Sequence, residues 1–265
     1  MNFAPNADEA LHFRKICTLS DRRWVRYAPA YVITNEPLRA EMAFMPKNCN
    51  NALTVAASGD HPFFCKLHGA RHVTTFDITC NAKLMSDIKI AALHELNIGE
   101  YFDLLKSLHT AKNPLFVPNM NKIIPHLPAF VQKYMVDMTK HGFSLFSAGR
   151  GTESYIPRSL QTSDFQELKT LVNEPFDFIW SDAVDLQLTE HYDFIHLSNI
   201  SDYLSYEKMG QVLINMINHT NVGGTIFAEQ QNHPNAELLF PQVSEKLSNW
   251  KLLSRGRMNV LQRIR

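Results

Sequence analysis

The sequence predicts an α/β protein built on a mostly parallel sheet, to which the C-terminal end adds one antiparallel strand. Three observations predict it. Short apolar runs alternate with helix-like segments, further strand-like runs follow residue 172, and two β-rich runs around Arg255-Gly256-Arg257 end the chain. Strand-helix alternation is typical of a parallel sheet covered by helices. A closing hairpin adds an antiparallel strand to such a sheet.

The first fifty residues are polar, aromatic and irregular. They predict an N-terminal arm at 1–50 rather than a separate domain, with short helical pieces near 7–16 and 37–44. The remainder, 51–265, is expected to form one Rossmann-like domain. At 265 residues and 45% hydrophobic content, the chain can bury one substantial core and still spare an insertion.

The first half of this domain shows the alternation most clearly. Its expected elements are a strand at 52–57, a helix at 62–69, a strand at 72–76 and a helix at 81–96. The first strand is a short apolar run that ends in the turn residues Ser58-Gly59-Asp60. Gly69 is suited to end the first helix as its C-cap.

A long segment at about 99–172 interrupts the alternation. It carries helical stretches separated by prolines and exceeds a normal crossover, so we expect an inserted helical cap. After it come strands at 176–180, 192–197, 225–228, 250–254 and 258–264, and a helix at 206–219.

The composition narrows the classes of partner that the protein is expected to bind. Lys plus Arg (26) equals Asp plus Glu (26), so no overall positive field exists to hold a nucleic acid, and a small-molecule acceptor is expected. Four widely spaced cysteines predict reduced thiols. The N-terminus lacks signal-peptide features and no apolar run is long enough to span a bilayer, which predicts a cytoplasmic protein. We expect a monomer or a homodimer. A lipid acceptor is also consistent with the sequence.

Polar residues follow the buried strands, where open parallel sheets bind ligands. The segment Ala56-Ala57-Ser58-Gly59-Asp60 lets a ligand approach the backbone closely. Asp77 follows about 20 residues after the glycine turn, where a carboxylate commonly binds ribose hydroxyls. Both also fit plain turn and capping roles. With one glycine and no phosphate cradle, a nucleoside without phosphates is favoured over a dinucleotide.

Two later strand ends carry a third set of candidates. Ser181-Asp182-Ala183 can hold an adenine edge, and Ser198-Asn199-Ile200-Ser201-Asp202-Tyr203 places polar groups under a reacting centre. A polar loop that caps the helix near Tyr206 is the alternative. The density of polar groups after a buried strand favours function.

Three other sequence patterns are weaker indications of a site. His61, His68 and His72 lack the spacing of a zinc site, so no metal is expected. Gly149-Arg150-Gly151 lacks the context of a phosphate loop, although Arg150 and Arg158 could meet an acidic acceptor. The aromatic and basic arm could stack nucleic acid, but packing of the arm over the ligand is favoured.

Four segments carry a resemblance to a known family. They are Ala30-Tyr31-Val32-Ile33-Thr34-Asn35-Glu36, Leu53-Thr54-Val55-Ala56-Ala57-Ser58-Gly59-Asp60, Asp77-Ile78, and Tyr192-Asp193-Phe194-Ile195-His196-Leu197-Ser198-Asn199-Ile200-Ser201-Asp202-Tyr203. In order and type they resemble S-adenosylmethionine-dependent 3-amino-3-carboxypropyl transferases, the family of the betaine-lipid enzyme, which is similar to isonocardicin synthase. The insertion at 99–172 matches only loosely.

The resemblance implies a class I methyltransferase fold and S-adenosylmethionine as co-substrate. The cofactor-binding positions it implies are Tyr31, Asn35, Ala57, Ser58, Gly59, Asp60, Asp77, Ile78, Asp182, Ala183, Ser198 and Ser201. It places Asn199, Asp202 and Tyr203 at the reacting groups. Glu36 would close the site together with Asn35.

The sulfonium chemistry leaves several outcomes open. A sulfonium carries three activated carbons, and orientation decides which one an aligned nucleophile attacks. Transfer of the aminocarboxypropyl group to an acceptor, its cyclisation to azetidine-2-carboxylate and ordinary methyl transfer are all consistent with the sequence. The nucleophile must lose a proton, for which Asp202 or Tyr203 is a candidate partner. A non-catalytic cofactor-binding module is the alternative outside enzymes.

Overall fold

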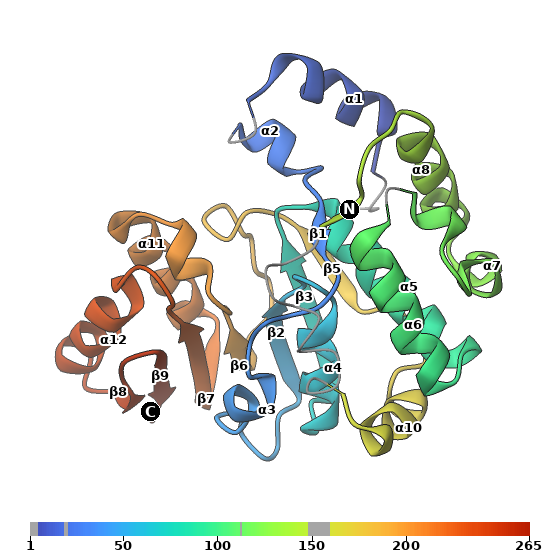
Figure 1. The fold of residues 1–265 in the computed structure, drawn as a ribbon. Coiled ribbons are helices and arrows are strands. Elements are labelled where there is room, and N and C mark those ends of the chain that lie inside the picture. The colour runs from blue at the N-terminus through green and yellow to red at the C-terminus, as the bar shows by residue number, and fades with distance from the viewer. Residues whose placement is uncertain (1–4, 19–20, 112, 148–159) are drawn as a thin grey trace. The chain divides into compact units, whose positions relative to one another are not determined.

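The structure, a computed structural model, describes residues 5–18, 21–111, 113–147 and 160–265 (Figure 1). Its strands are β1 Ala30–Tyr31, β2 Asn51–Val55, β3 His72–Asp77, β4 Phe146–Ser147, β5 Asp177–Trp180, β6 Tyr192–His196, β7 Thr220–Glu229, β8 Trp250–Ser254 and β9 Met258–Arg263. Its α-helices are α1 Ala7–Ile16, α2 Arg22–Val25, α3 Leu38–Met42, α4 Asp60–Leu67, α5 Cys80–Glu95, α6 Ile98–Thr110, α7 Met120–Ile123, α8 Ala129–Lys140, α10 Thr162–Leu171, α11 Tyr206–Asn218 and α12 Asn235–Lys246. Short 3₁₀ helices lie at η1 Pro114–Phe116, η2 Ile124–His126 and η4 Ile200–Tyr203.

The main sheet has seven strands in the order β5-β3-β2-β6-β7-β9-β8. Strands β2, β3, β6 and β7 pair in parallel, whereas β9 runs antiparallel to both β7 and β8. If these seven strands are renumbered from 1 to 7 in chain order, the order in the sheet is 3-2-1-4-5-7-6. The antiparallel strand β9 lies between β7 and β8, which run parallel to each other. This is the strand order of the Rossmann-like class I methyltransferase fold, and the predicted fold class is confirmed.

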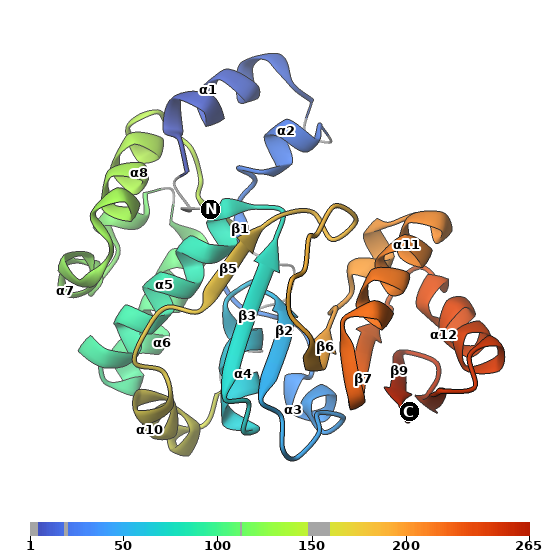
Figure 2. The ribbon, with the colours of Figure 1, turned by 180° about the vertical axis from the view of Figure 1, so that it is seen from behind.

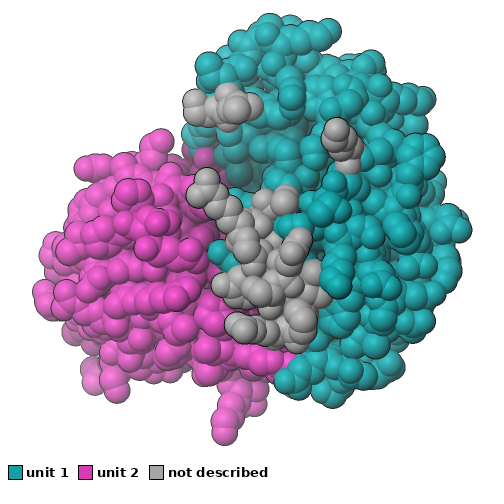
Figure 3. All heavy atoms as spheres, viewed as in Figure 1, with its two compact units in different colours: residues 1–35, 56–63, 77–180 teal, residues 36–55, 64–76, 181–265 magenta. Residues whose placement is uncertain are grey.

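The chain forms two interleaved compact units (Figure 3). Unit 1 contains 1–35, 56–63 and 77–180, and unit 2 contains 36–55, 64–76 and 181–265. The predicted division into an arm at 1–50 and a domain at 51–265 stays a prediction.

Unit 2 carries the register of the sheet. Val55 lies opposite Phe76 and Thr54 lies opposite His196, so β2, β3 and β6 reach the same edge with their carboxyl ends. Helices α11 and α12 pack beside β7, β8 and β9, as seen from behind in Figure 2. The amphipathic pattern of α11 explains this position, because Met209, Val212, Leu213 and Met216 form its buried face.

Unit 1 is mainly helical. The predicted insertion between the helix at 81–96 and the strand at 176–180 is confirmed, since α6, α7, α8 and α10 follow α5 there. A small parallel sheet joins the insertion to the arm, in which Ala30 pairs with Phe146. Neither strand of this small sheet was expected from the sequence.

The arm packs closely within unit 1. The Asn81 side chain donates to the backbone oxygens of Tyr27 and Ala28 at 3.0 Å each. The Thr79 hydroxyl also donates to Ala28 O, at 2.6 Å. Trp24 and Tyr27 are only 4% and 1% exposed, so these rings of the aromatic and basic cluster form core rather than a surface for stacking bases.

All four cysteines are free thiols, as the sequence predicts. Burial raises the pKa of both Cys49 and Cys80 to about 12, which keeps these thiols protonated. Among the described residues, no helix combines the length and apolar character that crossing a membrane requires.

Candidate functional site

The turn after β2 is strained and tightly packed. Ala57 adopts a left-handed backbone with φ of 47°, which is unfavourable for a residue with a Cβ. Gly59 has φ of 81°, and a Cβ built on it would lie 3.0 Å from Cα of Ser86 in α5. Glycine is therefore required here both by conformation and by the close approach of α5.

Asp77 ends β3 directly beside this turn, within unit 1. Its carboxylate accepts the Ala57 N–H at 2.9 Å and the Thr79 N–H at 3.0 Å. Burial raises the pKa of Asp77 to about 6, although these two hydrogen bonds and the nearby His61 act in the opposite direction. Asp77, the residue predicted to bind ribose hydroxyls, is thus a buried hydrogen-bond acceptor with a fixed orientation. It is only 9% exposed.

Asp60 has structural partners within unit 1. It accepts hydrogen bonds from Lys89 Nζ at 2.5 Å and from the Thr34 N–H at 2.9 Å. The Ser58 hydroxyl donates to it at 2.7 Å. These contacts connect the arm, the turn after β2 and α5, so Asp60 and Ser58 help to fix the shape of that turn.

The remaining unit 1 candidates lie along the arm and after β3. Tyr31 is 49% exposed on β1, and Asn35 is also exposed. The Ile78 carbonyl accepts the indole N–H of Trp180 at 2.9 Å. The end of β5 therefore lies beside the turn that follows β3, within unit 1.

Unit 2 holds the candidates that follow β5 and β6. Asp182 accepts the Val184 N–H at 3.0 Å, and Ala183 is buried. Ser198 has φ of 53°, a second left-handed residue, and it lies two positions after the end of the parallel strand β6. The Ser201 hydroxyl donates to Glu229 O at 2.9 Å, and Asn199 precedes η4 as its N-cap residue.

The predicted catalytic pair has unequal surroundings. Asp202 accepts backbone N–H groups of Gln231, Asn232 and His233, at 3.0, 3.1 and 3.0 Å for the shortest contact of each. Its carboxylate thereby orders the loop after β7. Tyr203 is 71% exposed.

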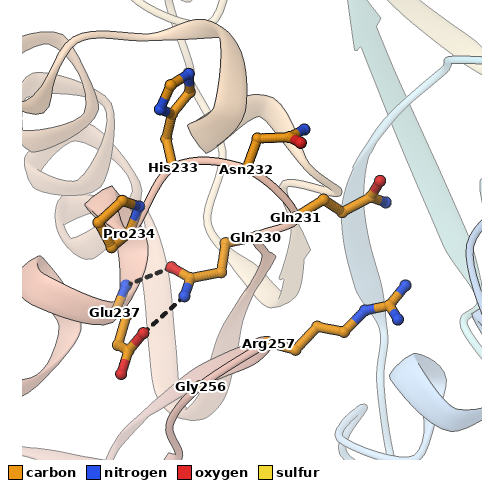
Figure 4. A pocket seen from close by; sticks show the side chains of 8 residues that line it. All are labelled: Gln230, Gln231, Asn232, His233, Pro234, Glu237, Gly256 and Arg257. Carbon is orange, nitrogen blue, oxygen red and sulfur yellow. Dashed lines mark hydrogen bonds between the residues drawn. The ribbon is translucent and has the colours of Figure 1, made fainter.

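That loop forms one side of a pocket in unit 2 (Figure 4). The pocket has a volume of about 450 Å³ and is lined by Gln230, Gln231, Asn232, His233, Pro234, Glu237, Gly256 and Arg257. Arg257 Nε donates to Glu229 Oε1 at 2.6 Å, which raises the pKa of the guanidinium; Glu41 and Glu36 add smaller contributions.

A buried pair beside Ser198 was not expected from the sequence. Glu41 of α3 and His196 of β6 are both fully buried, with Glu41 Oε2 2.9 Å from His196 Nε2. Together with Glu36, they are the one group of three metal-ligating side chains found among the described residues. A histidine inside an apolar strand was the available signal, but its partner lies 155 residues away.

The predicted residues thus form two sets. Unit 1 brings together the turn 57–60 and Asp77, whereas unit 2 brings together 198–203 and the loop after β7. That both sets serve one cofactor stays a prediction. The loop Gly149-Arg150-Gly151 and Arg158 lie outside the described residues.

Comparison with known proteins adds to this description. No family model matches the chain. No curated protein matches it either. Among solved structures, it is similar to the N-methyltransferase NodS from Bradyrhizobium japonicum WM9 in complex with S-adenosyl-L-homocysteine, at 8% identity, with 86% of this chain and 83% of that chain covered and a TM-score of 0.38.

Two further solved structures are similar to the chain. An rRNA methylase from Streptococcus thermophilus has 8% identity, 88% and 99% coverage and a TM-score of 0.43. A ribosomal protein L11 methylase from Lactobacillus delbrueckii subsp. bulgaricus has 11% identity, 91% and 86% coverage and a TM-score of 0.43. TM-scores this low carry no functional argument, so the assignment depends on this chain's own strand order and side chains.

Proposed function

We propose that the protein is an S-adenosylmethionine-dependent transferase that moves the 3-amino-3-carboxypropyl group to a small nucleophile and releases methylthioadenosine. The observation that carries the proposal is the Asp77 carboxylate, which ends β3 and is fixed against the turn after β2. A buried carboxylate at this position suits two adjacent hydroxyls of a ribose. The sequence resemblance supports the aminocarboxypropyl group as the one transferred.

The residues fit such a substrate in their chemistry. Each carboxylate oxygen of Asp77 accepts one N–H and can accept a further hydroxyl. The left-handed Ala57 and Ser198 follow the two neighbouring strands β2 and β6. Backbone strain of this kind concentrates at ligand-binding sites and supports a functional assignment of both turns.

The transfer itself needs few groups. The nucleophile attacks the γ-carbon of the aminocarboxypropyl chain, the carbon–sulfur bond breaks and its electron pair returns to sulfur. Because the leaving group is a neutral thioether, the protein's task is to orient the reactants and to accept the nucleophile's proton. If the substrate's own amine attacks, the product is azetidine-2-carboxylate; if the methyl carbon is attacked, the product is S-adenosylhomocysteine.

Product analysis tests the proposal. The protein is incubated with S-adenosylmethionine, alone and with methylamine, 2-mercaptoethanol and glycerol, and the nucleosides are separated by chromatography. Methylthioadenosine is the expected product. S-adenosylhomocysteine as the sole product would replace the proposal with methyl transfer. Binding without turnover would indicate a cofactor-binding module.

Asp77→Asn tests the carrying observation directly. Loss of a charge-assisted hydrogen bond to the ribose removes about 1.5–3 kcal/mol, so calorimetry should find affinity for S-adenosylmethionine reduced by about 10-fold to 100-fold. Asp103→Asn, at an exposed position of α6, is the control and should bind unchanged. Equal affinity of the Asp77 variant and wild type would remove the support for this site.

A further inference from the structure

A second pocket lies on one face of α5 and belongs entirely to unit 1. It has a volume of about 290 Å³. Helix α5 contributes Asp87, Ile90, Ala91 and Glu95 to its lining, and the segment before α8 contributes His126 and Leu127. All of these residues fall within 77–180, and none of them is a candidate for binding S-adenosylmethionine.

Asp87 is the most buried polar residue of this pocket, with only 3% of its surface exposed. Its Oδ1 accepts a hydrogen bond from the Lys83 ammonium, which lies one turn earlier in α5. Its Oδ2 is buried and has no hydrogen-bond partner within the part of the chain that the structure describes. A buried acceptor without a partner is destabilising, so a ligand that brings a donor to Oδ2 would gain binding energy there.

The contact with Lys83 decides which kind of donor suits Asp87. The ammonium already balances the carboxylate charge, and the two side chains are only 11% and 2% exposed. Burial raises the pKa of Asp87, and Lys83 acts in the opposite direction. A second cation at Oδ2 would lie beside Lys83 and would lose its hydration. A neutral donor such as a hydroxyl is therefore favoured at this end of the pocket.

Glu95 gives the other end of the pocket a different character. Its side chain is 34% exposed, and its Oε1 lies 3.4 Å from Nδ1 of His126. No lysine or arginine is among the described residues that line the pocket. A carboxylate that neither lysine nor arginine balances attracts a positively charged ligand group, and its partial exposure lets that group keep part of its water.

The spacing of these two carboxylates suits an organic molecule. Asp87 and Glu95 are eight positions apart in α5, which corresponds to about 12 Å along the helix axis. A hydrogen bond of about 2.8 Å at each end leaves about 6–7 Å, which a chain of about four or five carbons spans. The wall between them is apolar, because Ile90, Ala91 and Leu127 are buried there.

A metal ion suits the pocket less well. Among the residues that the structure describes, the one group of three metal-ligating side chains close enough to share an ion lies in unit 2. The carboxylates of this pocket therefore serve as separate anchors for the two ends of one ligand.

We propose that this pocket binds a short aliphatic amino alcohol, whose hydroxyl donates to Asp87 Oδ2 and whose ammonium group pairs with Glu95. The methylene chain lies against Ile90, Ala91 and Leu127. The inference goes beyond the proposed function and does not depend on it, because the pocket shares no residue with the sites proposed for S-adenosylmethionine.

A series of ligands tests the proposal on the wild-type protein without S-adenosylmethionine. Chemical shifts of the protein amides are followed by NMR during titration with 5-amino-1-pentanol, pentylamine, 1-pentanol and pentanoate. The amino alcohol should bind most tightly, and pentylamine and 1-pentanol should each bind at least about 3-fold more weakly because one end lacks its partner. Equal affinity for the amino alcohol and pentylamine, preference for pentanoate, or no saturable binding would overturn the proposal.

The double variant Lys83→Met/Asp87→Leu locates the hydroxyl end. It removes both members of the buried pair, since loss of Asp87 alone would leave the Lys83 ammonium buried without its partner. The affinity for 5-amino-1-pentanol should fall by about 10-fold and become equal to that for pentylamine. Lys133→Met/Asp137→Leu removes a pair of the same spacing from α8, outside the pocket, and should bind as the wild type does. Retained preference for the amino alcohol in the Lys83/Asp87 variant contradicts the placement.

Glu95→Gln locates the ammonium end. The affinities for 5-amino-1-pentanol and for pentylamine should fall by about 2-fold to 5-fold, as for loss of a partly exposed ion pair, whereas 1-pentanol should bind unchanged. Glu167→Gln, at an exposed position of α10, is the control and should bind all ligands as the wild type does. Unchanged binding of pentylamine to the Glu95 variant would show that the ammonium group does not lie there.

The outcomes keep the two proposals apart. The ligand series needs no variant, so it decides this proposal even if the double variant does not fold. A protein that binds the amino alcohol but makes no methylthioadenosine keeps this site and loses only the proposed function. A protein that makes methylthioadenosine but binds none of the four ligands loses only this site.

Discussion

The buried Lys89 ammonium of α5 lies 2.5 Å from the Asp60 carboxylate at the start of α4. The Lys89 side chain has no exposed surface, and burial lowers its pKa, partly offset by Asp60. The Asp60 side chain is only 10% exposed, so water replaces little of the interaction if either charge loses its partner. The pair therefore makes the turn after β2 sensitive to changes inside α5.

Lys89→Met should reduce the free energy of unfolding by about 3–5 kcal/mol, because it leaves the buried Asp60 carboxylate without its cation. Urea denaturation measures the change. Lys133→Met removes an ion pair whose lysine is 79% exposed and should change stability by at most about 1 kcal/mol. Equal effects of the two substitutions would contradict the role given to Lys89.

Asp77 should give stability a characteristic pH dependence. Its pKa rises from 3.8 to about 6 on folding, so the fold favours the protonated form. That contribution is present below pH 3.8 and is lost as the pH rises through 6. Relative to Asp77→Asn, the wild type should therefore lose about 3 kcal/mol between these limits. Unfolding free energies measured across the range check this, and a constant difference would refute it.

Gly59→Ala should destabilise the protein by about 1–3 kcal/mol, since it combines a left-handed backbone with a contact to Ser86. Gly69→Ala is the matched control, because φ at Gly69 is 96° but nothing lies within 4 Å of the added Cβ. The difference in melting temperature between the two variants measures the close approach of α5. Equal melting temperatures would mean that α5 can move to admit the added Cβ without a loss of stability.

Asp202→Ala should loosen the loop after β7, because three backbone N–H groups lose their acceptor. Since the loop is exposed, water compensates in part and the loss should be about 1 kcal/mol. Hydrogen exchange of the amides of 231 to 233 should accelerate. Asp202→Asn keeps one acceptor oxygen and should show a smaller effect; unchanged exchange in both variants would contradict the ordering role.

The sheet could be predicted from the sequence because its buried strands are apolar runs that end at turn residues. The two-residue strands β1 and β4 were missed because Ala30-Tyr31 and Phe146-Ser147 are too short to show a period. Strand β7 begins at Thr220, earlier than the predicted 225, because the apolar pattern starts only after Gly223 and Gly224. The fold class did not depend on these details.

The candidate site was predictable only where its chemistry is local. Asp77 stands out because it follows a strand and a glycine turn at a characteristic spacing. The contact between Glu41 and His196 joins positions 155 residues apart, and no local sequence pattern near either residue indicates the other. The same holds for Asp60, whose role becomes visible only when α5 brings Lys89 against it.

The pairing of β1 with β4 has a consequence for synthesis on the ribosome. Ala30 emerges 116 residues before its partner Phe146. At about 5–20 residues per second, this interval is roughly 6–23 s. During that time the arm has no edge to pair with, so its apolar side chains are exposed to chaperones and proteases until the insertion arrives.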